Sequence, residues 1–175
     1  MMISLSFVIA AETILRKFFS FSFGGVDELG GYAVAIAAPL AFTVAAVEQS
    51  HIRINLLYTR LPEGVKAALN ALAAVSMGIL SLYLLHFTLR TVRDTQAYQS
   101  IAQTPWATPL IYPQSIWLAA MALFAVAAVI LSAKACYLLL RRDWTGLNRR
   151  FGPGSVEEEL QVELDDLKKR GEAKQ

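Results

Sequence analysis

The sequence predicts an all-α integral membrane protein with four transmembrane helices, a short interfacial helix in the second loop and a charged C-terminal tail helix. Hydrophobic residues make up 55% of the 175 residues and charged residues only 17%, whereas soluble domains carry about 25% charged residues. The charges are also unevenly placed, since none occurs in residues 29–47, 67–89 or 95–133. Each run approaches or exceeds the ~20 apolar residues that cross a bilayer core, and each is apolar on all sides.

The predicted membrane domain covers residues 1–142, with spans at 2–19, 29–47, 67–89 and 113–137. Residues 143–175 are predicted to form a charged cytoplasmic tail. The first apolar stretch is not a secretion signal, because no basic residue precedes it and no small-residue cleavage pattern follows it. It is therefore assigned to the first span.

The basic residues predict the orientation of the spans through the positive-inside rule. The second loop carries Arg53, Arg60 and Lys66, and the segment after the fourth span carries Arg141, Arg142, Arg149 and Arg150. The other two connections carry Arg16 and Lys17, then Arg90 and Arg93. This excess predicts that the second loop and both termini lie in the cytoplasm.

Two segments outside the spans have helical patterns of their own. Residues 51–62 mix apolar and basic side chains, and Pro62 would end a short helix lying in the membrane interface. In the tail, residues 155–158 read Ser-Val-Glu-Glu, a capping box that opens an apolar repeat at helical spacing. The tail helix is either simply solvated or in coiled-coil contact with a partner.

Glu12 is the ionisable side chain that most needs an explanation, because such groups in a span are usually functional. A small multidrug antiporter also has four spans and an essential glutamate in its first helix, so a stand-alone exporter using Glu12 is the alternative hypothesis. However, Arg16 lies four residues later and can form an ion pair with Glu12. The long basic second loop, long third connection and tail also differ from those compact antiporters. We favour a structural Glu12–Arg16 pair near the outer interface.

The sequence predicts neither a catalytic site nor a cofactor. His51 and His86 raise the question of a haem, but His86 lies about 28 Å along span three, far from the end where His51 lies. The single cysteine, Cys136, has no second cysteine in the chain for a disulfide. No Walker-type loop, G-x-S-x-G turn or H-E-x-x-H pair is present. We therefore predict that the chain is not an enzyme.

The third connection, residues 91–113, contains three prolines: Pro105, Pro109 and Pro113. Because proline restricts its own backbone and that of the preceding residue, we predict a stiff segment here. Trp106 and Tyr112 would anchor it at the interface. The segment is either a contact surface or a simple membrane anchor.

Several of these features occur together in one known family. Their order is Arg16, then residues 26–29 (Val-Asp-Glu-Leu), then residues 50–57 (Ser-His-Ile-Arg-Ile-Asn-Leu-Leu) with Leu61-Pro62, and finally residues 103–105 (Gln-Thr-Pro). Over roughly residues 9–142, the chain resembles the small, DctQ-like permease subunit of tripartite ATP-independent periplasmic (TRAP) transporters. It differs from the family pattern at Ser50, where glycine is usual, and at Asn55, where aspartate is usual.

The resemblance implies a multi-pass protein of the bacterial inner membrane that pairs with a large, multi-span permease subunit. The large subunit would hold the substrate and sodium sites, and a periplasmic binding protein would deliver an organic acid. The small subunit would be a scaffold surrounded by membrane lipids, with no cofactor and no nucleic acid as partner. The candidate partner-contact residues are Arg16, Asp27, Glu28, His51, Arg53, Asn55, Pro62, Thr104 and Pro105.

Overall fold

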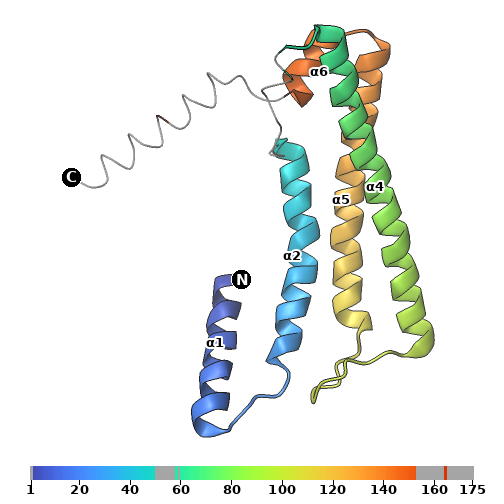
Figure 1. Ribbon diagram of the computed structural model, residues 1–175. Helices are drawn as coiled ribbons and strands as arrows, with labels where there is room; N and C mark the ends of the chain where they lie inside the picture. Colours follow the sequence, from blue (N-terminus) through green and yellow to red (C-terminus); the bar gives the residue numbers. More distant parts are fainter. Residues whose placement is uncertain (1, 50–57, 59, 153–163, 165–175) are drawn as a thin grey trace. The chain divides into compact units, whose positions relative to one another are not determined.

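The computed structural model describes residues 2–49, 58, 60–152 and 164, and these residues are almost entirely helical (Figure 1). The helices are α1 (Met2–Phe19), α2 (Val26–Glu48), α4 (Glu63–Tyr98), α5 (Ile111–Leu140) and α6 (Trp144–Phe151). The described residues contain no strand, although one isolated antiparallel bridge joins Ile101 to Pro109. The all-α prediction is therefore confirmed for this part of the chain.

Three of the described helices are long and apolar enough to cross a membrane: Glu28–Glu48 within α2, Glu63–Tyr98 and Ile111–Leu140. Helix α1 has the residue range expected for the first span, but its 18 residues include Glu12, Arg16 and Lys17. It extends over about 27 Å, slightly less than the ~30 Å of a bilayer core. The structure thus contains three candidate spans, and the assignment of α1 as the first of four spans stays a prediction.

Helices α4 and α5 extend beyond the spans expected for them. Helix α4 has 36 residues and is about 54 Å long, far more than the ~30 Å that a bilayer core requires. Its last turns include residues 91–98, so the third connection begins later than the predicted range of 91–113. The remaining connection folds back on itself, with backbone hydrogen bonds from Ala102 to Thr108 (2.9 Å) and from Leu110 to Ser100 (3.1 Å).

The helix ends explain where the chain turns. Gln49 caps α2 in the left-handed conformation, with its backbone N–H donating to the Ala45 carbonyl. Ser20, Gln99 and Arg142, which follow α1, α4 and α5, also have positive φ angles of 50°, 48° and 56°. A single left-handed residue satisfies carbonyls at a helix C-terminus and redirects the chain. Four helices here therefore end without glycine at that position.

The chain divides into two compact units. Unit 1 comprises Met1–Ser50 and Met77–Leu131, and unit 2 comprises His51–Ser76 and Ser132–Gln175. In unit 1, α1 packs against α2, and a core joins α2, α4 and α5 around Ala46, Met121, Phe124 and Ala128. The Phe42 and Phe124 rings lie 6.0 Å apart within this unit. Small α2 and α5 residues let the helices approach closely.

Unit 2 contains a helix in addition to those predicted from the sequence. Residues 143–175 were expected to be tail, yet Trp144–Phe151 forms α6 directly after α5. Its Leu147 and Phe151 side chains are buried. The predicted interfacial helix at 51–62 and the tail helix beyond residue 154 fall largely outside the described residues, so both stay predictions.

Candidate functional site

Each unit contains one group of polar side chains centred on a buried residue. Hydrogen bonds in each group join parts of the chain that are distant in sequence. The first begins at Glu12, which is only 3% exposed although it is charged. The Arg16 guanidinium donates to Glu12 Oε1 at 3.0 Å, which confirms the i,i+4 pair expected from the spacing. Arg16 itself is 54% exposed, so the pair has one buried and one solvent-facing member.

The loop after α1 supplies the other partners of Glu12. The Ser22 hydroxyl donates to Oε1 at 2.5 Å, and the Phe23 backbone N–H donates to Oε2 at 3.0 Å. Ser22 Oγ also accepts from the Gly24 N–H at 3.0 Å. Both carboxylate oxygens thus have donors, which is what allows a charged group to be buried. Ser22 and Phe23 could not be identified from the sequence, because no local spacing relates them to Glu12.

The same loop contacts the connection between α4 and α5. Trp106 Nε1 donates to the Phe23 carbonyl at 3.1 Å. A Cβ placed on Gly25 would lie 2.5 Å from Cδ2 of Trp106, and one on Gly24 would lie 3.3 Å from Cγ of Pro105. At Gly25 a side chain would force the Trp106 ring to move, whereas at Gly24 the contact is only tight and the positive φ of 59° is what favours glycine. We call this group the loop clamp, and it consists of Glu12, Arg16, Ser22, Phe23, Gly24, Gly25, Pro105 and Trp106.

Two further candidate residues lie beside the clamp in sequence. Glu28 is 8% exposed, and its Oε2 accepts from the Tyr32 hydroxyl at 2.9 Å. Within the described part of the chain, Glu28 Oε1 and the Thr104 hydroxyl are buried without a hydrogen-bond partner. Thr104 still organises its loop, because its carbonyl accepts from the Ala107 N–H at 2.9 Å.

The remaining sequence candidates are distributed differently. The Pro62 carbonyl accepts from the Val65 and Lys66 N–H groups at 3.0 and 3.1 Å, so this residue directly precedes α4 and pairs with its first turn. Asp27 lies in the first turn of α2. His51, Arg53 and Asn55, which form the second-loop motif, fall outside the described residues. The structure therefore brings Arg16 and Pro105 into one group and places Pro62 in the other unit.

The second polar group lies in unit 2 and centres on Asn70, which is 4% exposed. Its Nδ2 donates to the Tyr58 hydroxyl at 2.7 Å and to Asn148 Oδ1 at 3.0 Å. Asn148 Nδ2 in turn donates to the Glu63 carboxylate at 2.7 Å and to its carbonyl at 3.2 Å. These four residues, which we call the asparagine latch, connect α6 to the first turns of α4 (the elements are shown in Figure 1).

The local sequence positions α6 for this contact. Asp143 caps the helix by accepting from the Gly146 N–H at 3.0 Å. A Cβ on Gly64 would lie 3.5 Å from the Trp144 ring, so the ring packs against the start of α4. Asp143 followed by apolar residues at 144, 147 and 151 is a helix signal that could have been recognised in the sequence. The Asn70–Asn148 contact has no such local signal.

Other polar side chains in the spans make local contacts. Thr43, Ser76 and Ser81 donate to the carbonyls of Pro39, Ala73 and Gly78 in their own helices. No group of three His, Cys, Asp or Glu side chains capable of holding a metal occurs among the residues that the structure describes. These three hydroxyl groups are therefore paired within their own helices.

Three described helices that are long and apolar enough to cross a membrane indicate a helical membrane protein. The family model of the tripartite ATP-independent periplasmic transporters, DctQ component, matches residues 5–136. The chain therefore belongs to the DctQ family of TRAP transporter components. No curated protein and no solved structure gives a significant match.

Proposed function

We propose that the chain is the scaffold subunit of a sodium-driven TRAP transporter in the bacterial inner membrane. In this proposal it pairs with a large permease subunit, and a periplasmic binding protein delivers an organic acid. The family match over residues 5–136 is the observation that carries the proposal. It also argues against the alternative of a stand-alone multidrug exporter.

The contacts of the buried polar groups support a scaffold role. A transported anion needs compensating donors or cations near the bilayer midplane. In the described structure, Glu12 accepts from Arg16, Ser22 and the Phe23 amide. Asn70 donates to Tyr58 and Asn148. Groups committed to internal contacts stabilise the fold and are poor candidates for a site that binds and releases a substrate.

Reconstitution tests this function directly. Under a sodium gradient, liposomes containing the chain alone should accumulate none of three probes: a dicarboxylate, a keto acid or sialic acid. The chain co-expressed with the large permease subunit of its transporter should co-purify with that subunit through detergent extraction. Uptake should then require both membrane subunits and the binding protein. Sodium-driven uptake by this chain alone would refute the scaffold role, and failure to co-purify would refute the pairing.

The proposed orientation, with both termini in the cytoplasm, can be tested by cysteine labelling. Thr145 on α6 and Gln96 in the last turns of α4 are both exposed. In a Cys136→Ala background, Thr145→Cys should resist a membrane-impermeant thiol reagent in intact cells, while Gln96→Cys should be labelled. Permeabilised cells provide the control, since both positions should then react. The opposite labelling pattern in intact cells would reverse the orientation.

A further inference from the structure

A dense basic surface lies in unit 2, around and after the end of α5. Lys134, Arg141, Arg142, Arg149 and Arg150 are all exposed. Asp143 is the single acidic residue of the sequence between positions 134 and 156. Its carboxylate already accepts from the Gly146 N–H and the Thr145 hydroxyl. No ion pair among the described residues neutralises the four arginines. We call Arg141, Arg142, Arg149 and Arg150 the basic surface.

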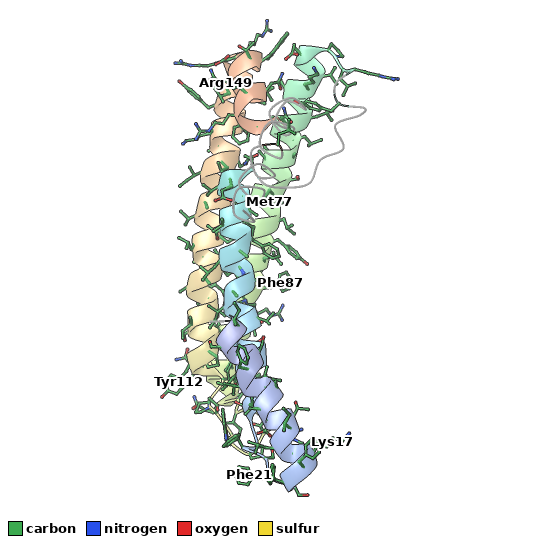
Figure 2. All side chains as sticks on the ribbon, turned by 90° about the vertical axis from the view of Figure 1, so that its left-hand side faces the viewer. Lys17, Phe21, Met77, Phe87, Tyr112 and Arg149 are labelled. Carbon is green, nitrogen blue, oxygen red and sulfur yellow. The ribbon has the colours of Figure 1, made fainter. Side chains whose placement is uncertain are left out.

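The fold places this charge at a defined position after α5. Arg142 has a left-handed backbone, and the Arg142 and Asp143 N–H groups donate to the Leu139 and Leu138 carbonyls at 3.0 and 3.1 Å. This tight turn leads directly into α6, which carries Arg149 (Figure 2). Leu147 and Phe151 are buried, and Arg149 follows Leu147 by about 200° of helical rotation. Arg149 thus lies on the side of α6 away from its packed face, and Arg150 is also exposed.

Two aromatic side chains accompany the arginines. Tyr137 is 52% exposed and Trp144 is 44% exposed. The Arg141 guanidinium lies over the Tyr137 ring, 4.7 Å from its centroid. Exposed tyrosine and tryptophan beside the end of a long apolar helix are typical of the depth of lipid headgroups. At that depth, phosphate is the anion available to the guanidinium groups, which bind phosphate through paired hydrogen bonds.

We propose that the basic surface, together with Tyr137 and Trp144, is a binding site for anionic phospholipid headgroups. Charge complementarity identifies the ligand, since four exposed arginines lie at the end of the most hydrophobic described helix. Each basic residue near an anionic membrane surface strengthens association roughly fivefold. The site would enrich anionic lipid around α6 relative to the bulk membrane. It requires only α5 and α6 and is independent of the transported substrate.

Trp144 is a built-in reporter for this site. The full chain would be placed in phosphatidylcholine–phosphatidylglycerol nanodiscs carrying an equal mole fraction of brominated phosphatidylglycerol or brominated phosphatidylcholine. Bromine quenches tryptophan at short range, and subtracting the signal of Trp144→Phe isolates Trp144 from the other two tryptophans. We expect clearly stronger quenching by the anionic lipid, and we expect added salt to weaken the difference because salt screens charges.

A matched pair of variants distinguishes a site from general charge. In Arg149→Gln/Arg150→Gln, quenching of Trp144 by brominated phosphatidylglycerol should fall to near the quenching by brominated phosphatidylcholine. Arg90→Gln/Arg93→Gln removes the same charge from the other end of α4 and should preserve the stronger quenching by the anionic lipid. Equal loss in both variants, or no stronger quenching in the parent chain, would overturn the proposal. A shift of Trp144 emission in neutral lipid would show that Arg149→Gln/Arg150→Gln disturbs the packing of Trp144. In that case Arg141→Gln/Arg142→Gln is the deciding variant. Loss of the stronger quenching by anionic lipid in that variant would support the site, and its retention would oppose it.

Discussion

Replacing Gly25 with alanine is expected to destabilise the protein by about 2–6 kcal/mol, the largest effect of any single methyl group in the loop clamp. Gly25 has φ 150° and ψ 0°, a conformation whose cost for a residue with a side chain is about 1–3 kcal/mol. The added Cβ would also lie 2.5 Å from the Trp106 ring, and forcing the ring aside adds about 1–3 kcal/mol. Thermal unfolding of the purified protein in detergent measures the change.

Gly31→Ala is the matched control, because a Cβ at that α2 position meets no atom within 4 Å. This variant should be as stable as the parent or slightly more stable, since alanine favours helix. A double-mutant cycle then separates the two costs of Gly25→Ala. In a Trp106→Ala background the steric cost should vanish and the backbone cost should remain. An identical cost in both backgrounds would show that Trp106 is not the obstacle.

Asn70→Ala is expected to cost about 1–3 kcal/mol, the penalty for leaving buried hydrogen-bonding groups without partners. Asn70 is buried and donates to both Tyr58 and Asn148. Its removal leaves Asn148 Oδ1 without its Asn70 donor, one of the three hydrogen bonds that connect Asn148 of α6 to α4. Because Trp144 packs against Gly64, release of α6 should also shift Trp144 fluorescence. Thermal unfolding and the emission maximum together measure the effect.

Ser76→Ala is the control for Asn70→Ala on the same helix. Ser76 is exposed and donates to the carbonyl of Ala73 in its own helix, so its loss should change stability by less than about 0.5 kcal/mol. Asn70→Ala and Asn148→Ala should be non-additive, because they remove one shared hydrogen bond. Full additivity, or an unchanged Trp144 spectrum in Asn70→Ala, would mean that the latch does not position α6.

The sequence by itself determined the features that depend on neighbouring residues. Charge-free runs that are apolar on all sides must form helices in a bilayer, where every backbone group needs an internal partner. The centres of α2, α4 and α5 follow from this rule. The Glu12–Arg16 pair follows from helix geometry, because residues four apart lie on the same face. The family resemblance was likewise carried by short local motifs, and the match over residues 5–136 confirms it.

Only the tertiary structure decided which polar groups meet across the chain. Trp106 donates to a carbonyl 83 residues away, and Asn70 donates to a side chain 78 residues away. Such contacts depend on how helices pack and how loops fold back, and residue spacing does not encode either. Helix α6 shows the same limit, since its eight residues are too few for a stable isolated helix. Its cap could be recognised locally, but its burial against α4 comes from the asparagine latch and the packing of Leu147 and Phe151.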